Sequence, residues 1–211
     1  MRLAVFGATG PTGKLLTRQA LDRGHHVTAL ARRPEAMQIE HLRLRVVPGD
    51  ILVPGTADSV VEGADAVLSA LGIGYHRHAT TVYSEGTGNI LAAMDRARVS
   101  RLLVVSTSSL HLPDRRELAL WLFIRLLLHP MLRRPYADIA LMEELIRRSD
   151  VDWTLACAAR LTNGRAAGAY RTAVNDRLRG GWSISRADLA SYLLDQVDSP
   201  SLHGAAVEIA Y

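Results

Sequence analysis

Cysteine and lysine are almost missing from this sequence of 211 residues, which contains one of each. Cys157 has no partner for a disulfide within the chain and lies in an apolar run, so we expect a buried thiol in a reducing, cytoplasmic setting. Because Lys14 is the only lysine, arginine supplies nearly all of the positive charge, and the formal net charge is +4. The arginines come in scattered pairs, such as Arg147-Arg148, and form no single stripe. We therefore expect no nucleic-acid partner.

Long hydrophobic runs are also missing. The longest, Leu118–Leu128, has eleven residues, whereas a transmembrane helix needs about 20. Because the run is apolar on nearly every side, a buried helix or a dimer surface is favoured, ahead of a lid beside a planar substrate. Peripheral membrane contact ranks last, so the sequence predicts no membrane partner and a monomer or homodimer.

Short apolar runs alternate with helical patterns along the chain. The runs do not alternate between apolar and polar residues, as expected for parallel strands covered on both faces. We predict an α/β fold with a doubly wound parallel sheet of the Rossmann type and a small C-terminal substrate-side region, as a single domain over residues 1–211. The expected strands are 2–6, 26–31, 43–48, 65–70, 101–106 and 151–157, and the expected helices are 13–23, 79–98, 137–148 and 186–197, the last capped by Ser185.

A glycine-rich loop follows the first expected strand and opens the first helix, and it reads Gly7-Ala8-Thr9-Gly10-Pro11-Thr12-Gly13. In this context Gly7 permits a tight turn, Gly10 lets the backbone approach a pyrophosphate, and Gly13 lets helix and strand pack closely. Thr9 and Thr12 add hydroxyl donors. The N-terminus of the helix then offers N–H groups and a partial positive charge, so the loop predicts a dinucleotide site.

Arg32 and Arg33 stand after the second strand, where a protein that selects NAD places an acidic residue. A guanidinium pairs with the 2′-phosphate that a carboxylate repels, so NADP(H) is preferred over NAD(H). Both arginines are also compatible with a solvated surface. Further cofactor contacts are expected at two other strand ends, from Asp50, Ile51, Leu71 and Gly72. Asp50 suits either the adenine amino group or a turn.

Several segments together resemble the atypical short-chain dehydrogenases/reductases, in particular NmrA-like NAD(P)H-binding proteins and the biliverdin reductase B (flavin reductase) type. They are the glycine loop, 49–52, 80–86, 89–94, 106–108, 168–170 and 184–188. The resemblance implies that the loop holds the pyrophosphate, Arg32 the 2′-phosphate and Asp50 the adenine. It also implies that Leu71 and Gly72 face the nicotinamide side and that Ser108 lies near it. Arg160 stands where the biliverdin reductase type has a histidine, which disfavours a bilin.

Ordinary short-chain dehydrogenases use a Tyr-x-x-x-Lys pair, in which lysine lowers the pKa of the tyrosine. Here Tyr136 is followed four residues later by Ala140, and no such pair exists. A planar conjugated acceptor asks less of the protein, because it delocalises the incoming charge and takes its proton from water. The candidate catalytic residues are Ser108, Tyr136 and Arg160, with Thr107 beside the cofactor; each also has a purely structural interpretation.

The sequence thus favours an NADPH-dependent reductase that transfers hydride to a flavin or quinone, and less readily to a bilin. Two alternatives remain: a non-catalytic NADP-sensing regulator that acts through a protein partner, and a tailoring oxidoreductase for an aromatic secondary metabolite. His76 and His78 are spaced like metal ligands but have no third ligand cluster near them in the sequence. We expect no metal.

Overall fold

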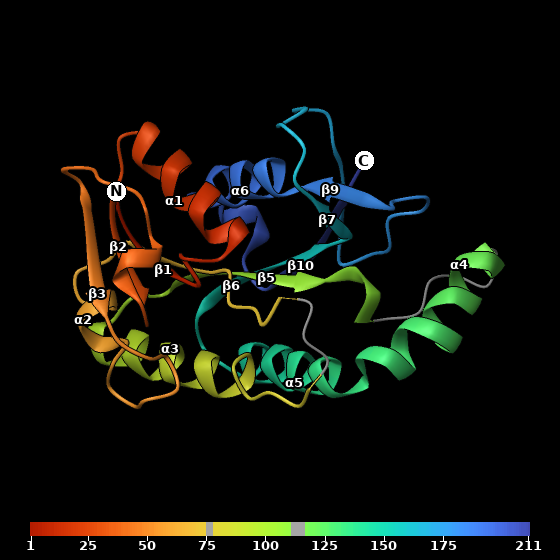
Figure 1. The fold of residues 1–211 in the computed structure, drawn as a ribbon, viewed down its shortest axis with the longest axis horizontal. Helices are drawn as coiled ribbons and strands as arrows, with labels where there is room; N and C mark the ends of the chain where they lie inside the picture. Colours follow the sequence, from red (N-terminus) through yellow and green to blue (C-terminus); the bar gives the residue numbers. More distant parts are fainter. Residues whose placement is uncertain (75–77, 111–116) are drawn as a thin grey trace.

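The central sheet of the protein has eight strands in the order β3-β2-β1-β4-β5-β6-β10-β8 (Figure 1). The computed structural model describes residues 1–74, 78–110 and 117–211. The strands are β1 (Arg2–Phe6), β2 (His26–Ala31), β3 (Leu44–Pro48), β4 (Ala66–Ser69), β5 (Arg101–Thr107), β6 (Asp152–Ala158), β8 (Arg171–Val174) and β10 (Ala205–Ala210). Two short strands, β7 (Arg160–Thr162) and β9 (Ser183–Ser185), pair separately. This arrangement confirms the predicted α/β fold class.

Six of the strands lie within a residue or two of the predicted ranges. The inner strands are covered on both faces, and β4, for example, is buried at every residue, whereas the edge strand β3 has no buried residue. Their pairs are all parallel, and only β8 runs antiparallel, along β10. The strands β7 to β10 were not predicted: β7 to β9 have only three or four residues each and β8 is mostly exposed, whereas β10 is a six-residue, mostly buried strand that the prediction lacks. These four strands build the C-terminal region.

Helices cover both faces of the sheet (Figure 1). On one face lie α1 (Pro11–Asp22) and α6 (Arg186–Asp195), and on the other α2 (Asp58–Val61), α3 (Ser84–Ala97) and α5 (His129–Arg147). Each face has its own apolar core. Ser185 caps α6 as predicted, because its Oγ accepts a hydrogen bond of 2.9 Å from the Asp188 N–H.

The start of α5 differs from the prediction. Residues 137–148 were expected to be helical, but α5 already begins at His129 and includes Tyr136. Pro135 lies inside the helix, and Leu132 departs from helical geometry with φ −109° and ψ 15°. A proline removes one helical hydrogen bond and kinks the helix on its N-terminal side. The sequence pattern before Pro135 therefore gave the wrong boundary.

The apolar run 118–128 is not a buried helix, so the first of the two favoured interpretations is wrong, whereas the dimer surface stays a prediction. It forms α4 (Leu118–Phe123) and a π-helical turn (Ile124–Leu128) that project beyond the end of the sheet (Figure 1). Leu126 is 67% exposed, whereas Ile124 is 5% exposed. Periodicity shows that a helix is apolar but not what covers it, and here the helix lies past the sheet that would have covered it.

No helix within the described ranges is both long and apolar enough to cross a membrane.

Candidate functional site

The glycine loop connects β1 to α1, and two of its glycines leave no room for a side chain. Gly7 has a φ of +73°, and a Cβ there would lie 2.3 Å from the Ala70 carbonyl oxygen. A Cβ on Gly13 would lie 2.1 Å from the Gly7 oxygen, so the first turn of α1 presses on the end of β1. A Cβ on Gly10 would meet only the Gly7 oxygen within 4 Å, at 3.3 Å. The loop is closed toward the protein and open at Gly10.

The N-terminus of α1 suits an anion. Within the described chain no side chain caps this end, and its first turn holds no acidic residue. The Lys14 N–H donates to the Gly10 oxygen at 2.9 Å, which leaves the N–H groups of Thr12 and Gly13 without a helical acceptor. Such N–H groups and the helix dipole stabilise phosphate. The residues present therefore fit the pyrophosphate of a dinucleotide.

Arg32 and Arg33 follow the carboxyl end of β2, which pairs with β1 directly beside the glycine loop. Both side chains are exposed. Neither guanidinium has an ion pair or a hydrogen bond among the residues that the structure describes. The two arginines can therefore turn toward an anionic group without breaking an ion pair or hydrogen bond to any described residue.

Asp50 and Ile51 follow β3 and form a firmly held turn. The Asp50 Oδ1 accepts a hydrogen bond of 3.1 Å from the Leu52 N–H, so this carboxylate does serve the turn. Asn89 of α3 donates from its side-chain amide to the Ile51 carbonyl oxygen at 2.7 Å. In the sequence, Asn89 stands out only as part of the family-like segment 89–94. Its contact with residue 51 spans 38 positions.

The segment after β4, with Leu71 and Gly72, packs closely against α3. A Cβ on Gly86 would lie 3.0 Å from the Leu71 Cδ1, so this glycine lets the helix approach. The Ile73 N–H donates to the Tyr83 hydroxyl oxygen at 3.4 Å. Burial raises the pKa of Tyr83, which keeps the phenol neutral. A glycine inside a helical pattern is a known sign of close packing, and Gly86 also ends the family-like segment 80–86.

Three hydroxyl groups meet beyond the carboxyl end of β5. The Tyr136 oxygen lies 2.6 Å from the Ser109 Oγ, which in turn lies 2.8 Å from the Thr107 Oγ1. Burial raises the pKa of Tyr136, and the hydrogen bonds with Ser109 and Thr107 only partly oppose this effect. His129 contacts the same group: its Nε2 lies 2.9 Å from the Ser109 carbonyl oxygen, and its ring packs edge-on to Tyr136. We call Thr107, Ser109 and Tyr136 the hydroxyl cluster.

Asp138, two residues beyond Tyr136, joins α5 to the start of α3. Its buried carboxylate accepts hydrogen bonds from the N–H groups of Tyr83, at 2.9 Å, and Ser84, at 3.2 Å, and from the Ser84 hydroxyl. A carboxylate at a helix N-terminus is favourable because it satisfies unpaired N–H groups and the dipole. Because Tyr83 also contacts Ile73, Asp138 holds α5, and with it Tyr136 of the hydroxyl cluster, in place relative to the segment after β4. No local pattern in the sequence points to this contact.

The other two predicted catalytic residues lie at neighbouring strand ends. In the parallel register Thr107 of β5 pairs with Ala158 of β6, so Ser108 and Arg160 follow adjacent ends. The Ser108 carbonyl oxygen accepts a hydrogen bond of 2.6 Å from Arg177. Arg160 is exposed, and its backbone N–H donates a hydrogen bond to the carbonyl oxygen of Trp182, the residue before β9. The hydroxyl that contacts Tyr136 is that of Ser109, so the catalytic roles of Ser108 and Arg160 stay predictions.

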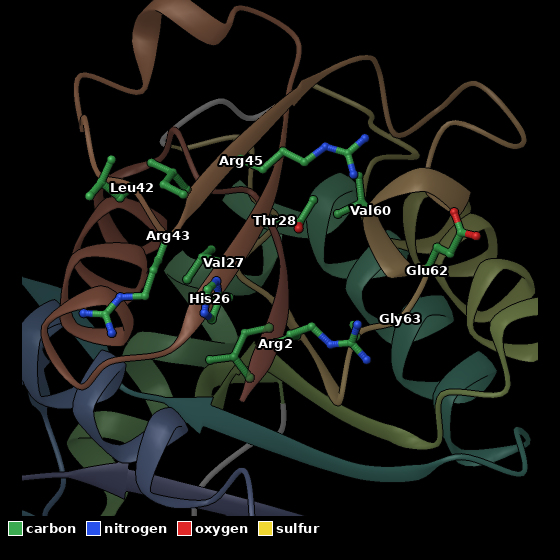
Figure 2. A pocket seen from close by; sticks show the side chains of 13 residues that line it. Arg2, His26, Val27, Thr28, Leu42, Arg43, Arg45, Val60, Glu62 and Gly63 are labelled. Atoms are coloured by element: carbon green, nitrogen blue, oxygen red, sulfur yellow. The ribbon is translucent and has the colours of Figure 1, made fainter.

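A depression at the opposite end of the strands is basic, but its charged side chains do not point toward a common centre. It lies at the amino ends of β1 and β2, and Figure 2 shows the guanidinium groups of Arg2, Arg43 and Arg45 pointing in different directions. Arg43 donates to the Gly24 carbonyl oxygen at 3.2 Å. Ligands of open α/β sheets bind beyond the carboxyl ends, so this depression is separate from the candidate site.

His76, one of the two histidines spaced like metal ligands, lies outside the described residues, and the ring Nδ1 of the other, His78, lies 2.9 Å from the Ala79 carbonyl oxygen. Among the described residues, no three His, Cys, Asp or Glu side chains are grouped so as to hold a metal ion.

Comparisons with known proteins agree with this geometry. A family model described as NAD(P)H-binding matches residues 7–200. Over 210 residues the chain is 24% identical to the protein YwnB of Bacillus subtilis (strain 168), covering 95% of this chain and 93% of that protein. It is 31% identical over 119 residues to the 3 beta-hydroxysteroid dehydrogenase/Delta 5→4-isomerase of Mycobacterium tuberculosis (strain CDC 1551 / Oshkosh), covering 51% of this chain but only 32% of that protein.

Among solved structures, the fold is similar to that of a short-chain dehydrogenase/reductase from Veillonella parvula DSM 2008 in complex with NADP. The TM-score is 0.81 at 18% sequence identity, and the match covers 100% of this chain and 94% of that chain. The chain therefore belongs to the NAD(P)H-binding family and has the Rossmann fold of the short-chain dehydrogenases/reductases.

Proposed function

We propose that this protein is an NADPH-dependent reductase that transfers hydride to a small planar conjugated acceptor, a flavin or quinone ahead of a bilin. The observation that carries the proposal is the hydroxyl cluster at the carboxyl end of β5, in which Tyr136 is held by Ser109 without a lysine. A ligand in an open α/β sheet lies beyond these strand ends, so the cluster borders the cofactor crevice.

The electrostatics of Tyr136 favour a hydrogen-bond donor over a base. Ala140 stands four residues later, where a Tyr-x-x-x-Lys pair has its lysine, and Lys14, in α1, bonds to Gln38. Burial raises the pKa of Tyr136 instead of lowering it, so the phenol stays protonated at neutral pH. A neutral phenol orients an acceptor and donates a hydrogen bond to an oxygen or nitrogen that gains negative character.

The preference for NADP(H) rests on Arg32 and Arg33. Their exposed guanidinium groups follow β2 beside the glycine loop, where a 2′-phosphate would meet them. The Veillonella protein, which shares the fold, has NADP in its structure. When bound, the nicotinamide supplies the hydride. The loop would hold its pyrophosphate, and Leu71 and Gly72 would border its nicotinamide.

The test is NADPH oxidation, followed by absorbance, against FMN, riboflavin, a naphthoquinone and biliverdin, with NADH in parallel. We expect acceptor-dependent oxidation that is faster with a flavin or quinone than with biliverdin. The variant Tyr136→Phe should lower turnover by about tenfold or more, because losing one oriented donor removes part of the charge stabilisation. Its dissociation constant for NADPH should not change. Tyr170→Phe, which removes the hydroxyl of a partly buried tyrosine whose ring packs against that of Tyr192, is the matched control.

Tight binding of NADPH with no oxidation of it by any of these acceptors would contradict the reductase. It would favour the non-catalytic NADP-sensing regulator. Equal turnover by Tyr136→Phe and the wild type would show that the hydroxyl cluster takes no part in the reaction.

A further inference from the structure

The projecting segment formed by α4 and the π-helical turn, which we call the apolar arm, exposes more large apolar side chains than any other described segment of similar length. Leu118, Leu122 and Leu126 are spaced four residues apart and so lie along one stripe, and Phe123 and Leu127 lie beside it. All five are at least 40% exposed. Contiguous exposed apolar surface of this kind marks an interaction site in a soluble fold.

The charged residues within the apolar arm and in the first half of α5 are all basic; the nearest carboxylate before the arm, Glu117, accepts a hydrogen bond of 3.1 Å from the Gly180 N–H. From Leu118 to Ala137 the sequence contains no Asp or Glu, whereas Arg125, Arg133 and Arg134 are all exposed. The Arg125 guanidinium lies over the ring of Trp121, 5.2 Å from its centre. The arm thus combines an apolar stripe, a tryptophan and a basic flank, which is the pattern of a helix that lies in the plane of a membrane surface.

We propose that the apolar arm docks on the surface of an anionic lipid bilayer. From the sequence, peripheral membrane contact ranked behind a buried helix, a dimer surface and a lid, but the side chains of the arm are exposed in the structure. An interfacial helix needs no spanning length; it needs exposed apolar side chains and a basic face, and the structure has both. The leucines and Phe123 enter the acyl boundary while the arginines pair with lipid phosphates.

A second copy of the chain fits the apolar arm less well. In a two-fold contact each residue near the axis meets its own counterpart. Such a contact centred on the arm would set Arg125 against Arg125 of the other copy, with no acidic residue of the arm to neutralise the pair. An anionic surface neutralises Arg125, Arg133 and Arg134 without a like-charge contact of this kind, so charge complementarity favours the bilayer.

The docking surface adjoins the candidate site. His129 directly follows the arm, and its Nε2 lies 2.9 Å from the Ser109 carbonyl oxygen. Docking is nevertheless independent of catalysis, because no residue of the arm belongs to the hydroxyl cluster. Membrane binding can therefore be measured without any acceptor.

The experiment is flotation of the full chain with vesicles of phosphatidylcholine, with and without phosphatidylglycerol. The wild type should float with the anionic vesicles and bind neutral ones at least tenfold more weakly. The double variant Leu122→Asp/Leu126→Asp should lose binding at least tenfold. The matched control is Leu141→Asp/Leu145→Asp, which places the same charges on exposed leucines of α5 and should bind as the wild type does.

A second variant separates charge from apolar contact. Arg133→Ala/Arg134→Ala should remove the preference for anionic vesicles, and raising the salt from about 0.1 M to about 1 M, which shortens the Debye length from about 10 Å to about 3 Å, should have the same effect on the wild type. Circular dichroism verifies that each variant is folded.

Two results would overturn the proposal. One is a wild-type protein that stays in the lipid-free fraction after flotation with either kind of vesicle. The other is a wild-type dimer, measured by analytical ultracentrifugation, that Leu122→Asp/Leu126→Asp converts to monomers while vesicle binding is absent. That second result would assign the apolar arm to another copy of the chain.

Discussion

Substitution of Gly13 by alanine tests the close contact between α1 and β1 on which the glycine loop depends. The added Cβ would lie 2.1 Å from the Gly7 carbonyl oxygen and 2.7 Å from the Ala8 Cα. Both are backbone atoms, so no side-chain rotation can relieve the overlap. For the new Cβ to reach an ordinary contact distance of 3.4 Å from the Gly7 oxygen, the helix or the loop must shift by about 1 Å.

The energetic cost follows from that shift. Overpacking in a closely packed region costs about 1–3 kcal/mol, and an overlap this deep belongs at the upper end. Replacing glycine with alanine in a helix returns about 1 kcal/mol. We therefore expect Gly13→Ala to lower the free energy of unfolding by about 2 kcal/mol. A shift of about 1 Å in the N–H groups that face the pyrophosphate should also weaken NADPH binding by at least about tenfold, or about 1.4 kcal/mol.

The matched control is Gly88→Ala on α3, because a Cβ there would meet nothing within 4 Å. This variant gains helix propensity without an overlap, so its free energy of unfolding should rise by about 0.5–1 kcal/mol. Urea unfolding followed by circular dichroism gives both values, and titration of NADPH followed by protein fluorescence gives the affinity. If Gly13→Ala were as stable as Gly88→Ala and bound NADPH like the wild type, the proposed role of Gly13 would be refuted.

Three further substitutions test the cofactor preference, the chemistry and the C-terminal region. Arg32→Ala should weaken NADPH binding at least about tenfold more than NADH binding, because only NADPH carries the phosphate that Arg32 would pair with; equal losses in two parallel titrations would contradict this. Ser109→Ala should lower turnover more than Ser108→Ala, since the Ser109 hydroxyl contacts Tyr136, and steady-state kinetics with NADPH would show the opposite order if Ser108 were the catalytic serine. Asp188→Asn should lower the free energy of unfolding by about 2 kcal/mol at neutral pH, because this buried carboxylate accepts four hydrogen bonds that lower its pKa although burial opposes them. The carboxylate stabilises the fold above its ordinary pKa of 3.8 and loses this effect as the pH falls through the lowered value, so unfolding curves at acidic pH should show a smaller difference from the wild type.

The sequence by itself determined the parts of this protein that local chemistry controls. Six mostly apolar runs without strict alternation predicted the parallel strands, because a strand covered on both faces is apolar at most positions. The glycine loop predicted the cofactor site, because only glycine fits the positive φ at Gly7 and the contact at Gly13. Ser185 predicted the start of α6, because a helix cap is a contact over three residues.

Only the tertiary structure decided which distant residues meet. Tyr136 and Ser109 are 27 residues apart, and the kink before Pro135 and the packing of α5 bring their hydroxyls to 2.6 Å. The contact of Asp138 with Ser84 spans 54 residues and likewise has no local signal. The exposure of the apolar arm follows the same rule. A hydrophobic pattern indicates that one surface of a helix is apolar, but only the arrangement of the other elements decides whether the chain buries that surface.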